Sequence, residues 1–289
     1  MIQTLRNAWR IPELRKKMLY TIFILIIFRL GAAIPVPFID VAALGETFTA
    51  YGDTLLGYFN VLSGGALSQA TLFALTITPY INASIIIQLL TVAIPALERM
   101  SKEGGEEGQK KIAAITRYVT VAIGLVLGFT YYTMIKRYGL LERTDAWSAV
   151  VIIASFTAGS ALVMWLGERI TEKGVGNGIS IILFAGIISR LPSMITSAAT
   201  QMTAGVITWY ELVIAIVISA AVILFVVFMS KAERRLPVQY AKRVVGRKQY
   251  GGQSTHLPIK VNMSGVMPVI FASSILALPG TIALFLTPK

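Results

Sequence analysis

The residues that could support catalysis or ligand chemistry are few and widely spaced. His256 is the only histidine, there is no cysteine, and neither an HExxH zinc-protease motif nor a GxSxG serine-hydrolase motif occurs. The run GVGNG at 174–178 has the glycines of a phosphate-binding loop but lacks the Lys-Ser/Thr ending of such loops. We therefore expect no enzyme, no metal and no cofactor, and interpret 174–178 as the flexible start of a helix.

An unusual combination of apolar and helix-breaking residues occurs at 63–90, SGGALSQATLFALTITPYINASIIIQLL. This stretch is apolar enough to enter a membrane. Gly64 and Gly65 weaken helix continuity, and Pro79 removes a backbone donor. We expect a short helix near 55–68 and a spanning helix that begins near Pro79. Backbone groups freed at the break must be enclosed by protein or a water-filled cavity. The upstream piece is either an interfacial helix or a small movable element inside an outer funnel.

The composition indicates an all-α, multispanning membrane helical bundle. The chain is 55% hydrophobic and only 14% charged, more apolar than one soluble core of 289 residues requires. Seven apolar stretches approach the roughly 20 residues that cross a bilayer. They cover residues 19–36, 72–96, 116–135, 147–167, 177–196, 210–230 and 263–286.

The net charge of +12 is distributed unevenly between the connections of these spans. Most of the 26 Lys and Arg residues precede the first span or follow the second, fourth and sixth. Because basic residues are retained in the cytoplasm during insertion, we expect a cytoplasmic N-terminus and an external C-terminus. The basic lead over 1–17 shows no signal-peptide cleavage pattern.

Two pairs of aliphatic residues suit the lining of a pore. Ile77 and Ile81 are four residues apart, as are Ile179 and Leu183, so each pair shares a helix face. Such pairs are ordinarily lipid-facing or core residues. If they converge on an axis, they form a dry constriction that excludes water and ions.

The stretch 231–262 carries eight basic residues and one acidic residue, with Gly251-Gly252 at a possible turn. Holding topology or contacting anionic lipid explains the charge. Docking to RNA or to an acidic protein face explains the charge and also the length, since topology needs only a few charges.

Four long blocks carry a resemblance to a known family. They are IFRLGAAIPVPFID (27–40), LSGGALSQATLFALTITPYINASIIIQLL (62–90), MWLGERITEKGVGNGISIILFAGI (164–187) and YAKRVVGRKQYGGQSTHLPIKVNMSGVMPVIFASS (240–274). These blocks resemble the SecY family, the channel subunits of the bacterial protein translocase. The similarity extends in order from end to end of the chain.

The resemblance implies two pseudo-symmetric halves around an hourglass pore. Residues 1–200 match the N-terminal half with spans one to five, and 201–289 match part of the C-terminal half. Family members usually have ten spans and this sequence stops after the seventh, so the second half is expected to be incomplete.

The resemblance also assigns candidate site residues. The pore ring matches Ile77, Ile81, Ile179, Leu183 and Ile270. The plug matches Leu55, Leu56, Gly57, Tyr58, Phe59, Asn60, Val61, Leu62, Ser63, Gly64, Gly65, Ala66 and Leu67. The helix from Pro79, the third span and the seventh span match a lateral gate, with polar positions Asn82 and Ser274. Arg243, Arg247 and Lys248 match a cytosolic loop that engages the SecA motor or the ribosome.

The expected function is a non-enzymatic, protein-conducting channel subunit of a bacterial plasma membrane. It would pass unfolded secretory chains and release transmembrane segments to lipid. Its expected partners are SecE, SecG, the SecA motor ATPase, the ribosome, signal peptides, nascent chains and anionic lipids. A secondary transporter of small solutes is the alternative that the broken second helix permits, although no acidic residue lies deep in a predicted span. An insertion scaffold without a pore is a third possibility.

Overall fold

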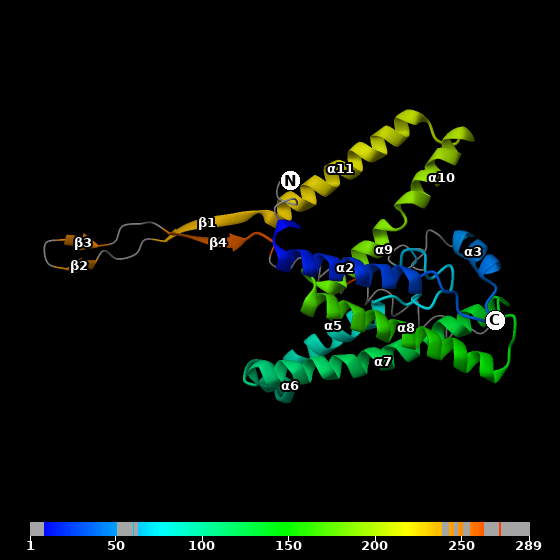
Figure 1. Ribbon diagram of the computed structural model, residues 1–289, viewed down its shortest axis with the longest axis horizontal. Helices are drawn as coiled ribbons and strands as arrows, with labels where there is room; N and C mark the ends of the chain where they lie inside the picture. The colour runs from blue at the N-terminus through cyan, green and yellow to red at the C-terminus, as the bar shows by residue number, and fades with distance from the viewer. Residues whose placement is uncertain are drawn as a thin grey trace. The chain divides into compact units, whose positions relative to one another are not determined.

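The computed structural model describes residues 9–50, 60, 63–238, 243–245, 248–250, 255–262 and 272. The elements are α2 (Pro12–Gly31), α3 (Val41–Ala50), α5 (Thr78–Ala93), α6 (Pro95–Lys102), α7 (Gly105–Arg137), α8 (Ala146–Lys173), α9 (Gly178–Ile188), α10 (Leu191–Thr203), α11 (Trp209–Lys231), β1 (Glu233–Val238), β2 (Arg243–Val245), β3 (Lys248–Tyr250) and β4 (Thr255–Lys260) (Figure 1). The chain divides into two compact units, Met1–Ser193 and Met194–Lys289, with the boundary inside α10.

Membrane-length helices account for most of the predicted spans. Within the described residues, α7, α8, the pair α9–α10 and α11 are long and apolar enough to cross a membrane. They confirm helices at the third to sixth predicted spans. The first predicted span, 19–36, is the helix α2, which lies earlier in the chain than expected. The seventh, 263–286, lies outside the described residues except for Ala272.

The second predicted span, about 72–96, is a shorter helix in the structure, where α5 covers Thr78–Ala93. The helix α5 begins only at Thr78, with Pro79 in its first turn, so the predicted break at this proline is confirmed. At the other end α5 and α6 are bent by 102°. Pro95 starts α6, and a residue before proline is disfavoured in the helical region. Ile94 is accordingly extended, with φ −108° and ψ 113°, and the chain turns there.

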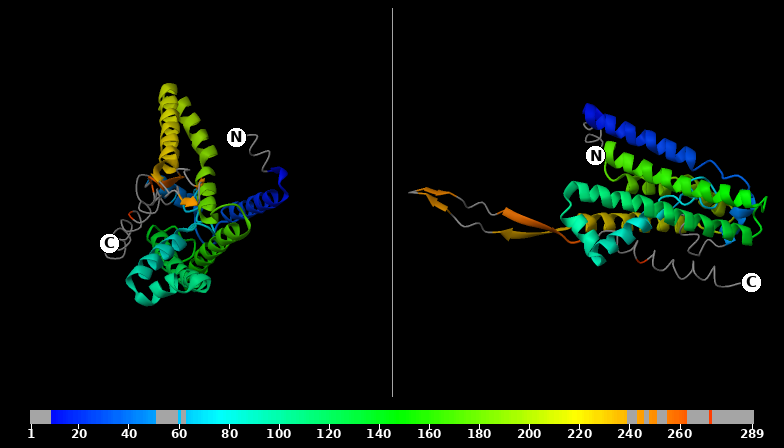
Figure 2. Two further views of the ribbon diagram at one scale, coloured as in Figure 1. Left: turned by 90° about the vertical axis from the view of Figure 1, so that its left-hand side faces the viewer. Right: turned by 90° about the horizontal axis from the view of Figure 1, so that it is seen from below.

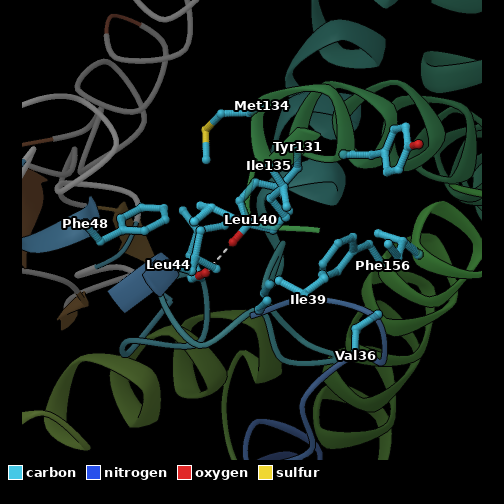
Figure 3. Close-up of a cluster of buried hydrophobic side chains, with 14 residues drawn as sticks. Val36, Ile39, Leu44, Phe48, Tyr131, Met134, Ile135, Leu140 and Phe156 are labelled. Carbon is cyan, nitrogen blue, oxygen red and sulfur yellow. Dashed lines mark hydrogen bonds between the residues drawn. The ribbon is translucent and has the colours of Figure 1, made fainter. Parts of the chain in front are cut away.

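Two clusters of buried apolar side chains form the core of Met1–Ser193. The first, shown in Figure 3, joins α3, the end of α7 and the start of α8. The second, which we call the waist cluster, joins α2, α8 and α9 and contains Ile24, Phe28, Phe73, Ile77, Val163, Leu166, Ile170 and Ile182. The non-helical residues 63–77, which we call the turn segment, contribute Leu67, Ala70 and Ala74 to the first cluster and Phe73 and Ile77 to the second. The turn segment therefore links the two halves of the core.

Glycines allow helices to approach the turn segment closely. A Cβ atom at Gly159 of α8 would overlap the carbonyl oxygen of Leu72, and one at Gly31, the last residue of α2, would overlap the ring of Phe73. In a membrane, helices associate largely through such close packing, because lipid is as apolar as the helix surfaces. These two glycines therefore fix the turn segment between α2 and α8.

Polar contacts show which connections share an end of this unit. The Val175 N–H donates to Thr21 Oγ1 at 3.2 Å, so α2 lies beside the connection between α8 and α9 at a point one turn after Lys17. The Asp40 N–H donates to the Leu140 carbonyl at 3.0 Å, which joins the segment after α2 to the connection between α7 and α8. The helices α2, α7 and α8 run lengthwise, at an angle to one another, between these two sets of contacts (Figure 2).

The second unit contains α11 and a ribbon of strands. The Thr208 N–H donates to Glu211 Oε2 at 2.9 Å in a capping box that starts α11. The strands β1 and β4 pair antiparallel, as do β2 and β3. These strands, which the all-α expectation did not include, occupy the predicted basic loop. Val245 pairs with Lys248, so the chain reverses between these residues, whereas the possible turn at Gly251-Gly252 lies outside the described residues.

Replacing Gly159 with alanine is expected to lower the stability of the detergent-solubilised protein by about 1–3 kcal/mol, because α8 must move away from Leu72. Gly45→Ala in α3 is the matched control, since a Cβ there meets no atom within 4 Å. Thermal unfolding of the two variants checks this. Equal midpoints would show that α8 does not depend on this close contact.

Candidate functional site

The structure brings the predicted pore-ring residues that it describes into one place. Ile77 is fully buried in the waist cluster, and Ile81, Ile179 and Leu183 pack against that cluster partly buried. A Cβ added to Gly167 of α8 would lie 3.2 Å from Ile179 Cγ1 and 3.6 Å from Ile77 Cδ1. Ile77 and Ile179, about 100 residues apart in the sequence, thus both pack against Gly167, where the missing side chain leaves room for them. Ile270 lies outside the described residues.

The backbone at the start of α5 determines how Ile77 and Ile81 are placed relative to the helix. Ile77 precedes the helix with φ −100° and ψ 2°, and the Ile81 N–H donates to the Ile77 carbonyl at 3.0 Å. Thr76 has a φ of +51°, which is uncommon for a residue with a branched side chain. The chain therefore turns sharply at Thr76 before α5 begins, so Ile77 lies just outside the helix and not on its face as predicted.

The start of α9 determines where Ile179 and Leu183 lie. Asn177 caps this helix, because its side-chain oxygen accepts from the N–H groups of Ile179 at 3.1 Å and Ser180 at 3.3 Å. A Cβ at Gly178 would overlap the Gly167 carbonyl oxygen. The interpretation of 174–178 as a helix start is confirmed. Gly174 and Gly178 allow close packing, whereas Gly176 permits a φ of +70°.

The predicted plug is described only in part. Leu55, Leu56, Gly57, Tyr58, Phe59, Val61 and Leu62 lie outside the described residues. The predicted helix over 55–68 is wrong for 63–68, which form turns with φ of +68° at Gly64 and +87° at Gly65. Asn60, Ser63, Ala66 and Leu67 are buried. The described part of the plug is thus an enclosed turn.

Gly64 seats this turn against the end of α9. A Cβ at Gly64 would lie 2.5 Å from the Gly186 carbonyl oxygen and 2.8 Å from Ser189 Oγ. On the other side, Tyr131 of α7 donates a hydrogen bond to the Leu67 carbonyl. The turn therefore contacts α7 and α9, and it is followed directly by the residues of the waist cluster.

Chain pairing anchors the downstream end of the turn. The Val36 N–H donates to the Ala70 carbonyl and the Leu72 N–H to the Ile34 carbonyl, both at 2.9 Å. Pro35 and Thr71 form the antiparallel bridge between these bonds. The backbone after α2 thus satisfies groups that a helix would have paired internally.

Only some of the predicted lateral-gate and docking residues lie within the described part of the chain. Asn82 lies near the start of α5 and is partly buried, whereas Ser274 and Arg247 lie outside the described residues. Arg243 opens β2 and Lys248 opens β3, so both lie near the tip of the ribbon. The structure therefore leaves the pairing of Asn82 with Ser274 as a prediction.

Two polar contacts were missed by sequence reasoning. Arg117 of α7 pairs with Glu168 of α8 through Nε and Oε1 at 2.9 Å, and Tyr131 reaches Leu67 from 64 residues away. Local sequence gave no signal for either partner. Within the described chain, no group of three acidic or histidine side chains is placed to hold a metal ion.

The arrangement is the fold of a protein-conducting channel. The chain superposes on a solved protein-conducting channel with a TM-score of 0.65 and 19% identity, covering 97% of this chain and 62% of that one. It superposes on Sec61 of the canine ribosome-channel complex with a TM-score of 0.64 and 18% identity, covering 97% of this chain and 63% of that one. At these identities the likeness shows the fold alone.

Sequence relatives then identify the family. The sequence model of the SecY family matches residues 71–288. The SecY translocase subunit of Thermotoga maritima is 44% identical over 98% of this chain and 67% of the relative, and that of Escherichia coli K12 is 47% identical over 94% and 62%. The chain belongs to the SecY family of protein translocase subunits, which are integral membrane proteins. It spans about two thirds of the length of these relatives.

Substituting Gly64 with alanine is expected to loosen the described part of the predicted plug, which we call the plug turn, more than the same change at Gly65. Both residues have positive φ, so both variants incur a backbone cost of about 1–2 kcal/mol. Only Gly64 also faces a carbonyl oxygen at 2.5 Å, since the nearest atom to a Cβ at Gly65 lies 3.8 Å away.

The chain has no cysteine, so Ala66→Cys provides a unique label at a position that is 3% exposed. A maleimide should modify this cysteine faster beside Gly64→Ala than beside Gly65→Ala. Equal rates would mean that the seat on α9 does not hold the turn.

Proposed function

We propose that this chain supplies the larger part of a protein-conducting channel that passes unfolded secretory chains and releases transmembrane segments to lipid. The meeting of Ile77, Ile81, Ile179 and Leu183 at the waist cluster carries the proposal. An aliphatic ring accommodates any side chain because it makes no specific polar contact, and it blocks water and ions at rest by dewetting. Ile270 completes the ring in this proposal.

Residues 55–67 act as the plug that closes this constriction. The burial of Asn60, Ser63, Ala66 and Leu67 supports this role, as does the direct continuation of the turn into the waist cluster. In a solved SecY channel of similar fold, the plug domain stabilises the closed state of the translocation channel and maintains a membrane seal.

The helix α5, the helix α7 and the seventh span form the lateral gate. Asn82 and Ser274 provide a small polar cluster that favours the closed state. An apolar signal segment that replaces this contact shifts the gate toward its open state, because it binds that state better. In the same scheme residues 1–200 form one half of the channel and 201–289 begin the other.

The chain lies in a bacterial plasma membrane with its N-terminus in the cytoplasm. The contact of Thr21 with Val175 supports this orientation, because it brings two basic connections to the same end of the unit. SecE and SecG are the membrane partners, and anionic lipids surround the basic ends. The SecA motor ATPase or the ribosome binds the ribbon tip at Arg243, Arg247 and Lys248 and drives the nascent chain, so this subunit needs no catalysis of its own.

Cysteines at Ile81 and Ile179 are expected to form crosslinks to a stalled secretory chain. The experiment uses a channel in which this chain is joined to the C-terminal spans of a SecY relative. Phe184→Cys is the control, because this residue of α9 is 63% exposed and lies away from the waist cluster. Crosslinks at Phe184 but not at the two isoleucines would reject the pore and favour a transporter or a scaffold.

Reversing the charge at the ribbon tip is expected to weaken SecA or ribosome binding about tenfold or more, since buried or close charge pairs dominate such contacts. The variant carries Arg243→Glu, Arg247→Glu and Lys248→Glu. The matched control reverses Arg234, Arg235 and Lys260, which make the same change of net charge on β1 and β4. Membrane insertion should be normal in both. Equal loss of binding in both variants would indicate a general charge effect instead of a docking site.

A further inference from the structure

The plug turn pairs many of its polar groups internally. The Asn60 side-chain oxygen accepts from the Ser68 N–H at 3.0 Å, and the Asn60 carbonyl accepts from the Gly65 N–H at 2.9 Å. Ser63 Oγ accepts from the Leu67 N–H at 3.2 Å. Buried polar groups without partners are costly. A turn with these internal bonds is able to leave its seat as a unit, because the bonds move with it.

One hydrogen bond crosses from a transmembrane helix into this turn. Tyr131 of α7 donates its phenolic O–H to the Leu67 carbonyl oxygen. The tyrosine is 5% exposed, and its ring meets Phe156 of α8 edge to face with the centroids 5.0 Å apart. Since α8 holds the ring, the hydroxyl is fixed in a position to meet Leu67.

We propose that Tyr131 is a positioning residue that latches the plug in its closed position. The inference rests on the proposed function, because the turn must close a pore for a latch to matter. Displacing the turn separates the Leu67 carbonyl from its donor, whereas the internal bonds of the turn survive. Because α7 also belongs to the proposed lateral gate, movement of α7 withdraws the hydroxyl. The latch thereby couples gate opening to plug release.

The test measures ion leak through resting channels reconstituted in lipid bilayers, with this chain joined to the C-terminal spans of a SecY relative. Tyr131→Phe is expected to raise the leak about five- to tenfold, the equilibrium effect of one lost buried hydrogen bond. Tyr132→Phe is the matched control, because it removes a hydroxyl from the adjacent residue, which is 6% exposed. A leak equal to that of the Tyr132 variant would overturn the latch.

Deleting residues 57–67 separates this inference from the proposal on which it rests. If the deletion does not raise the leak, the plug assignment fails and the latch fails with it. If the deletion raises the leak while Tyr131→Phe does not, the plug stands and the latch fails. The latch also requires that Tyr131→Phe add nothing in the deletion background. A further increase there would assign the residue to general packing of α7.

Discussion

Backbone N–H and C=O groups inside a membrane require hydrogen-bond partners, and the turn segment meets this requirement without being a helix. Ala70 and Leu72 pair with the chain after α2, and Leu67 pairs with Tyr131. Irregular backbone at membrane depth is tolerated when protein encloses it. The late start of α5 and the position of Ile77 outside its first turn both follow from this enclosed departure from helical structure.

Small residues make the enclosure possible. Gly159 admits the backbone of Leu72, and Gly167 admits the side chains of Ile77 and Ile179. Gly124 of α7 similarly faces Ser160 of α8, with a Cβ there 3.0 Å from Ser160 Oγ. These contacts gain dispersion energy only at short range, so small changes in volume on α8 act on the turn segment and the waist cluster together.

Much of the helical architecture could be predicted because hydropathy directly reports burial in lipid. The spans at α7, α8 and α11 and the break at Pro79 follow from local composition. The turn at 63–68 could not be predicted, since Ala66 and Leu67 are good helix formers and the contact of Gly64 with Gly186 joins residues remote in sequence. The four-residue spacing drew attention to Ile77 with Ile81 and to Ile179 with Leu183, and the family resemblance assigned them to a ring, but the spacing could not show that Ile77 lies outside α5. The partner of Tyr131 and the ribbon pairing depend on tertiary contacts, which leave no local signal.

The buried start of α5 has an electrostatic consequence. A helix carries a partial positive charge at its N-terminus, where the first N–H groups lack partners within the helix. In α5 this terminus begins beside Ile77, which is 0% exposed, so water screens its potential weakly. If the waist cluster is the pore constriction of the proposed channel, a positive potential there opposes the passage of protons and other cations. In the proposed channel, the break that shortens α5 thus adds a charge barrier to the closed state, in addition to the steric barrier of the aliphatic side chains.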